Sequence, residues 1–348
     1  MAKLDEVGIK TQIKNNEFEK AYLIYGEESY LKKHYVSQIR KKLIDPTFED
    51  FNLHIFDGKD AQLDDALKDA QILPMMGEYN LVIVKDYPIT RSKNDIKLLE
   101  EYLEDPSETT VFIMLFDSYE PDEKTATFKN LVKLFDASGA VVNLQKRSEN
   151  DVAKLLVNGA KKRGSSIDIN NARYLISVSG NDLEVLLNEL DKLSFYAKDS
   201  EITRQIIDDM ATKCLQARIY DVSKAIASGN ADGAYNSLGI LFEQKTEAIV
   251  INSAIAGAYI DMYRVKCAKT AGFSYDKVAN DFNYRGREFA LKNASRNCVN
   301  LTEAQLRKSL DEILDTDLKL KSTGIDSRLA LEELIAKLIL IARGVSYA

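Results

Sequence analysis

Five short apolar runs, separated by segments with helical periodicity, dominate the first 145 residues of the chain. The runs read AYLIYG, FNLHIFDG, NLVIVKD, TVFIMLFD and AVVNLQ. Three of them contain unbroken apolar stretches, which are typical of strands buried on both faces of a sheet. Between the runs, apolar residues recur at helical spacing, as at Leu63, Leu67 and Ala70. This alternation predicts a parallel sheet flanked by helices, an architecture that binds nucleotides in many proteins.

Helical patterns replace the strands near Lys146. The segment SEND, from Ser148 to Asp151, resembles a helix capping box, in which the serine side chain accepts from amides of the first turn. Later helical patterns are interrupted at SGNAD, near Gly272 and at CVNLTE. We therefore predict an α/β domain followed by a small helical domain and a larger helical domain, with the bounds 1–145, 146–213 and 214–348.

The composition is that of a globular protein and restricts its partners. The chain has 348 residues, of which 45% are hydrophobic and 29% charged, enough for two or three domains. Its net charge of −7 argues against a surface that binds polyanions generally. The first 145 residues carry 18 Lys and Arg against 27 Asp and Glu, whereas the remainder carries 29 against 27. Contact with nucleic acid is therefore expected only locally, and in the second half.

Cysteine usage and hydropathy predict a soluble protein of the cytoplasm. The three cysteines lie far apart and outside any CxxC pair, so neither a disulfide framework nor a zinc site is expected: Cys214, Cys267 and Cys298. The amino-terminal segment is too charged for a signal peptide. The apolar run AIVINSAIAGAYI has 13 residues and contains Asn252, too short to span a bilayer. We expect no membrane contact.

The turn after the first strand lies where a phosphate-binding loop would lie. Such a loop has the spacing GxxxxGK[ST], with amides and a lysine for the phosphates and a hydroxyl for magnesium. Here the second glycine is absent, Lys32 is followed by Lys33, and two glutamates repel a polyanion. We interpret the turn as a degenerate phosphate loop without nucleotide, or as a plain β-turn-helix whose acidic residues favour the helix start. Its residues are Gly26, Glu27, Glu28 and Ser29.

The remaining parts of an ATPase site are also missing from the sequence. The strand LVIV ends in Lys85 and Asp86 rather than in an Asp-Glu pair, and no Ser-Arg follows FIMLFD. His34 and His54 lie on different elements without a sequence partner for metal binding or acid–base work. We predict no catalytic residue, no metal and no cofactor.

An apolar segment follows the helical pattern that precedes the third strand. The sequence DAQILPMMGEYN places Ile72 and four further apolar residues in a row, which cannot all lie on one helical face. Pro74 disfavours helix at the preceding residue, and Gly77 turns the chain. We predict an exposed tip that anchors a partner's apolar pocket. The alternative is that Leu73 and Met75 cover the core at the helix-to-strand junction.

Five stretches, in this order along the chain, resemble the delta subunit of bacterial DNA polymerase III, which belongs to the sliding-clamp loader. They are YLIYGEESYL, FNLHIFDG, ILPMMGEYNLVIVKD, NDLEVLLNELDKL and DTDLKLKSTGIDSRLALEELI. The resemblance implies an AAA+-like α/β domain without nucleotide, a helical lid and a helical collar within a five-subunit ring. It further implies that the delta-prime subunit and ATP-binding tau or gamma subunits complete the ring, and that the complex loads the clamp onto primed DNA.

The same resemblance implies a role for the apolar segment. In this family a helix tip, commonly a Leu followed by an aromatic residue, inserts into a pocket on the clamp (beta subunit) and holds one ring interface open. The positions that match here are Leu73, Pro74, Met75 and Met76, without the aromatic residue. We expect Leu73 and Met75 to fill the pocket, with Met76 in support.

A basic and aromatic segment, FNYRGREFALKNASR, is a candidate contact for DNA in the second half of the chain. Its basic residues include Arg285, Arg287 and Lys292, and phosphates favour such patches. The alternative is a solvated helix face that packs within the helical domain.

Three other functions are alternatives to clamp opening. A delta-prime-like subunit would carry clustered cysteines and a Ser-Arg-Cys finger, which this chain lacks. An ATPase of the same fold, acting alone, would need a working phosphate loop. A scaffold that docks partners on its helical half would bind them without the apolar tip.

Overall fold

The computed structural model describes residues 4–58, 62–88, 93–198, 200–284, 288–322 and 324–345. The chain divides into two compact units, Met1–Arg147 and Ser148–Ala348.

The first unit is built on a five-stranded, fully parallel sheet with the order β2-β3-β4-β1-β5. Strands β1, β3 and β4 are buried almost throughout, as their unbroken apolar runs predict. The predicted α/β fold class, with a parallel sheet between helices, is confirmed for this unit. The strands are β1 (Ala21–Tyr25), β2 (Leu53–Asp57), β3 (Asn80–Lys85), β4 (Thr110–Leu115) and β5 (Ala140–Asn143).

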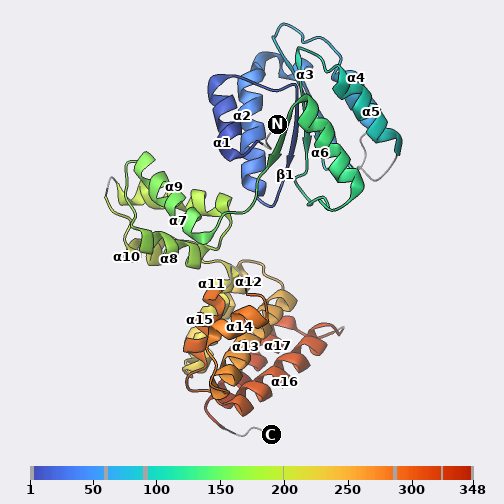
Figure 1. Ribbon diagram of the computed structural model, residues 1–348. Coiled ribbons are helices and arrows are strands. Elements are labelled where there is room, and N and C mark those ends of the chain that lie inside the picture. The colour runs from blue at the N-terminus through green and yellow to red at the C-terminus, as the bar shows by residue number, and fades with distance from the viewer. Residues whose placement is uncertain are drawn as a thin grey trace. The chain divides into compact units, whose positions relative to one another are not determined.

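Helices cover both faces of the sheet (Figure 1). One face packs its apolar side chains, including Leu23 and Phe112, against three helices: α4 (Leu63–Asp69), α5 (Lys93–Glu104) and α6 (Ala126–Ser138). On the other face, the Tyr22 hydroxyl donates to Gln12 Oε1 at 2.9 Å. The helices there are α1 (Glu6–Asn15) and α2 (Ser29–Leu43). A short 3-10 helix (Pro46–Phe48) and α3 (Glu49–Asn52) lead into β2.

Helix α4 is shorter than its sequence pattern predicts. The helical spacing that begins at Gln62 predicts a helix up to Ile72, whereas α4 ends at Asp69. The amides of Gln71 and Ile72 bond to the carbonyls of Lys68 and Asp69, three residues back, so the last turn tightens. The Ile72 carbonyl then accepts from the side chain of Asn80 at the start of β3. With these contacts the helix ends, and the apolar segment that follows is not helical.

The second unit is helical throughout the part that the structure describes, apart from one isolated bridge. Ser148 caps its first helix by accepting from the Asp151 amide at 3.2 Å. One hydrophobic core joins the helices α7 (Glu149–Lys162), α8 (Ile169–Ser179), α9 (Leu183–Ala197) and α10 (Arg204–Met210).

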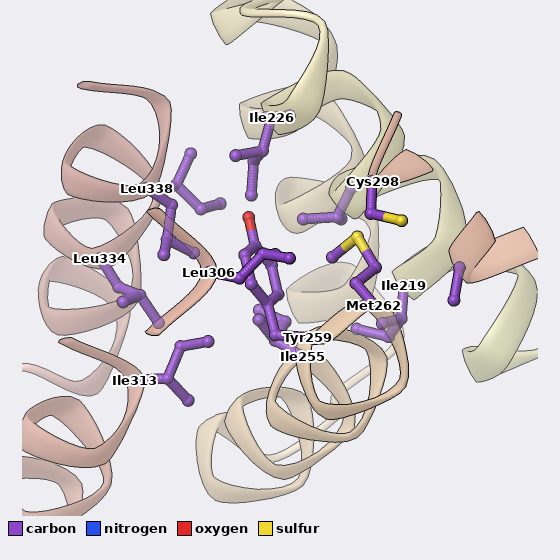
Figure 2. Packing of buried hydrophobic residues seen from close by; sticks show 14 of the residues in the cluster. Ile219, Ile226, Ile255, Tyr259, Met262, Cys298, Leu306, Ile313, Leu334 and Leu338 are labelled. Atoms are coloured by element: carbon purple, nitrogen blue, oxygen red, sulfur yellow. The ribbon is translucent and has the colours of Figure 1, made fainter. Parts of the chain in front are cut away.

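A second, larger core joins the remaining helices of this unit. Figure 2 shows the buried Tyr259 side chain near the centre of the cluster, with its hydroxyl directed toward Ile226. The helices are α11 (Leu215–Ala227), α12 (Ala231–Glu243), α13 (Ala248–Thr270), α14 (Tyr275–Asp281), α15 (Glu288–Asn297), α16 (Glu303–Leu320) and α17 (Ser327–Ala342). None of the helices that the structure describes is long and apolar enough to cross a membrane.

The partly buried carboxylate of Glu6 links the beginning of the first unit to its end at Arg147. Glu6, at the start of α1, accepts from the Tyr35 hydroxyl at 2.7 Å and from Arg147 Nη2 at 2.6 Å. Lys10 Nζ lies 2.7 Å from the same carboxylate. Charge-assisted hydrogen bonds of this kind are stronger than neutral ones, so Glu6 anchors the point at which the chain leaves the unit.

We expect the contribution of Glu6 to stability to be lost in acid. Burial alone would raise the pKa of this carboxyl, but hydrogen bonds from Lys10 and Tyr35 and the charge of Arg147 outweigh it and hold the pKa below its ordinary value of 4.5. A carboxyl with a lowered pKa stabilises the fold above its unfolded pKa, and this contribution is lost as pH falls through the folded pKa. Glu6→Gln should therefore lower the free energy of unfolding by about 1–2 kcal/mol at neutral pH.

Urea unfolding of the wild-type chain and Glu6→Gln at a series of pH values measures this difference. The gap between the two should stay constant down to about pH 5 and shrink below it. A gap that is the same at every pH would contradict the assignment.

Candidate functional site

The carboxyl ends of the parallel strands meet at one edge of the sheet, where a phosphate loop would work. Gly26 has a φ of 117° there, and a Cβ at this position would lie 2.4 Å from the Leu144 carbonyl oxygen. The same oxygen accepts from the Glu28 amide at 2.9 Å, and the Leu144 amide donates to the Tyr25 carbonyl at 2.8 Å. The backbone after β5 therefore closes onto the loop and uses the Glu28 amide that a phosphate would need.

The lysine and the hydroxyl of this segment are also engaged inside the protein. Lys32 is 2% exposed, and its Nζ donates to the carbonyls of Phe116 at 2.6 Å and Asp117 at 3.3 Å. Burial lowers the pKa of Lys32, while Asp117 and Asp86 oppose that shift. The Ser29 hydroxyl donates to Asp117 Oδ1 at 2.7 Å. Both groups stabilise the end of β4 rather than facing solvent.

Asp86, which directly follows β3, uses its carboxylate to accept hydrogen bonds from backbone amides. Asp86 Oδ1 accepts from the amides of Asp117 at 2.7 Å and Ser118 at 2.9 Å. A magnesium site would need these oxygens as ligands. Among the residues that the structure describes, no three His, Cys, Asp or Glu side chains gather in a way that could hold a metal ion.

The apolar segment lies at the opposite, amino-terminal edge of the sheet, between α4 and β3. Its large side chains project into solvent, with exposed fractions of 76% for Leu73, 53% for Met75 and 79% for Met76, and Pro74 is half-buried. Ile72 is also half exposed. The alternative in which Leu73 and Met75 cover the core does not hold. We call residues 72–76 the apolar tip.

Two buried asparagines hold the tip by its backbone. The Asn52 side chain accepts from the Met75 amide at 2.7 Å and donates to the Met75 carbonyl at 2.9 Å. Asn80 donates to the Ile72 carbonyl. Both asparagines are almost fully buried. Neither asparagine was predicted from the sequence, where the one signal for them is a polar residue at the edge of an apolar strand pattern.

Further apolar residues lie on the elements next to the tip. Phe51, which precedes Asn52 on α3, is 54% exposed, and Ile55 on the edge strand β2 is 49% exposed. His54 Nδ1 lies 2.9 Å from Asp69 Oδ2, which ties β2 to the end of α4. The histidine therefore acts as a structural link at this edge.

Of the three basic residues predicted to contact DNA, the structure describes one. Arg285 and Arg287 lie outside the described residues, whereas Lys292 is exposed on α15. Of the neighbouring aromatic residues, Tyr284 is buried and accepts from Arg264, whose guanidinium also stacks over Phe282 at 4.2 Å. These aromatic contacts serve the packing of the helices, and DNA binding by the three basic residues stays a prediction.

Two segments of the chain, one in each half, match models of the same protein family. A family described as "DNA polymerase III, delta subunit" matches residues 22–145, and its counterpart, "DNA polymerase III delta subunit, C-terminal domain", matches residues 216–338. A third family, described as a middle domain, matches residues 148–209.

Individual relatives agree with this assignment along nearly the whole chain. The DNA polymerase III subunit delta of Bacillus subtilis is 27% identical over 335 residues, which cover 94% of this chain and 95% of that protein. The solved structure of the Bacillus subtilis DNA clamp loader delta protein is 26% identical, covers 95% of this chain and 98% of its own, and superposes with a TM-score of 0.64. The chain belongs to the family of the DNA polymerase III delta subunit.

Proposed function

We propose that this chain is the clamp-opening subunit of a replicative clamp loader, acting in the cytoplasm. Its tip inserts Leu73 and Met75, with Met76 and Pro74 in support, into an apolar pocket of the sliding clamp (beta subunit) and holds one clamp interface open. Delta-prime and ATP-binding tau or gamma subunits complete a five-subunit ring that loads the clamp onto primed DNA. The observation that carries the proposal is an exposed apolar tip on a member of this family.

The geometry of the tip suits an anchor that binds a preformed pocket. Large apolar side chains in contact with water carry a cost that is recovered when a partner buries them, at roughly 25 cal/mol per Å² of apolar surface. The unbranched methionines adapt to the shape of a pocket without a fixed rotamer, which compensates for the missing aromatic residue. A few such residues dominate the energy of an interface when they lie at its centre.

The closed phosphate loop supports a function without ATP hydrolysis by this chain. The Glu28 amide, the Lys32 ammonium and the Ser29 hydroxyl bond within the protein, and Asp86 supports the backbone after β4. An ATPase would have to break several of these contacts before nucleotide could enter. Nucleotide-dependent steps therefore belong to the partner subunits.

Replacement of the tip side chains should abolish most of the binding to the clamp. The double variant Leu73→Ala/Met75→Ala removes both anchors from an exposed turn, so the fold is expected to remain intact. We expect a loss of at least about 2 kcal/mol, or about thirtyfold in Kd, in titrations of the full chain with the sliding clamp of the same organism in the absence of ATP.

Val7→Ala is the matched control for this experiment, because Val7 on α1 is 68% exposed and lies away from the tip. Its affinity for the clamp should equal that of the wild-type chain. A tip variant that binds as tightly as the control would favour a scaffold that docks partners elsewhere. A wild-type chain that does not bind would exclude clamp opening.

Addition of Mg-ATP should leave the thermal stability of the chain unchanged. A site with a Kd of about 10 μM, at 1 mM nucleotide, would stabilise the folded state by about 2.7 kcal/mol and raise the unfolding temperature by several degrees. A thermal scan with magnesium alone is the reference. An upward shift of this size with ATP would revive the hypothesis of a stand-alone ATPase.

A further inference from the structure

The buried amide of Asn52 is placed to control the conformation of the apolar tip. Asn52 ends α3, and its side chain makes both hydrogen bonds that the Met75 backbone can offer, at 2.7 Å to the amide and 2.9 Å to the carbonyl. The two residues are 23 positions apart in the chain. The side chain is 2% exposed, so water does not compete for these bonds.

The hydrogen bonds from Asn52 fix the backbone of the tip and leave its side chains free to contact a partner. Asn80 holds the Ile72 carbonyl from the other end, so the tip is held at both of its ends by buried amides. Between these points the chain carries Leu73 and Met75 outward. Met76 follows with a φ of 52°, a left-handed conformation that unbranched residues adopt at a cost. A turn of this kind persists only where the surroundings hold it.

Gly77 belongs to the same arrangement. A Cβ at this position would lie 2.9 Å from Asn52 Nδ2, closer than real Cβ contacts allow. The absence of a side chain at residue 77 therefore leaves room for the Asn52 amide to reach Met75.

We propose that Asn52 is a positioning residue for clamp binding: it preorganises the apolar tip by holding the Met75 backbone, and it contributes affinity through Leu73 and Met75 rather than by touching the clamp. The inference rests on the proposed function. A loop that is already ordered loses less conformational entropy on binding, which increases affinity without any new contact. Without Asn52, the Met75 amide and carbonyl lose their partners and the turn must find another conformation.

A double-mutant cycle on the full chain tests this role through clamp affinity without nucleotide. Asn52→Ala should weaken binding by about tenfold in the wild-type background. In the Leu73→Ala/Met75→Ala background it should add less than about twofold, because the residue acts through side chains that are no longer present. A general effect on folding would produce the same loss in both backgrounds.

Two further variants separate positioning from stability. Gly77→Ala pushes the Asn52 amide away from Met75 without removing a buried group, and it should weaken clamp binding in the same direction as Asn52→Ala. Asn252→Ala is the matched control: Asn252 is 1% exposed, and its Nδ2 also donates to a backbone carbonyl, that of Ile313, but in the second unit. Its clamp affinity should remain within about twofold of wild type.

Hydrogen exchange at the Met75 amide supplies a readout that does not involve the clamp. The amide should be protected in the wild-type chain and should exchange faster in Asn52→Ala and Gly77→Ala. Wild-type affinity in both variants, or equal losses in the two backgrounds of the cycle, would overturn the inference while leaving clamp binding established. A wild-type chain that does not bind the clamp would overturn both.

Discussion

The parallel sheet of the first unit must be buried on both faces, and this requirement organises everything else in that unit. Because all five strands run in the same direction, their carboxyl ends meet at one edge and their amino ends at the other. Helices occupy the two faces, so the loops at the edges are what remains available for function. The turn after β1 and the apolar tip lie at opposite edges, so the contacts that fill one edge leave the other edge free.

At the carboxyl edge, the polar groups of the turn after β1 make hydrogen bonds within the protein. Lys32 would be costly to bury as an unpaired cation, and two backbone carbonyls at the end of β4 compensate for that burial. The Leu144 carbonyl oxygen accepts the hydrogen bond of the Glu28 amide in the turn after β1. An architecture that binds nucleotides in other proteins is here filled by internal hydrogen bonds, since a fold does not by itself determine a function.

The strands and the exposed tip can be predicted from the sequence, whereas the buried polar contacts cannot. Unbroken apolar runs predict β1, β3 and β4 because burial on both faces leaves no room for polar alternation, and Pro74 predicts that the tip leaves the helix. The burial of Lys32 was not predicted, since a lysine in an amphipathic helix ordinarily faces water. The role of Asn52 depends on a contact 23 residues away, and local periodicity contains no information about contacts at that distance. Arg285 and Arg287, which were selected for their charge, lie outside the described residues.

An exposed apolar anchor poses a physical problem that the buried asparagines help to solve. Side chains such as Leu73 and Met76 favour collapse onto the protein's own surface, because water contact with apolar groups is unfavourable. A backbone held at Ile72 and Met75 opposes this collapse, since folding the backbone of the turn inward would break buried hydrogen bonds. The polar contacts that shape the tip are therefore placed beneath it, and its outer surface is left to apolar groups alone. This separation lets the tip present an apolar surface on a preorganised backbone. Such a backbone loses less conformational entropy when a partner's pocket binds the tip.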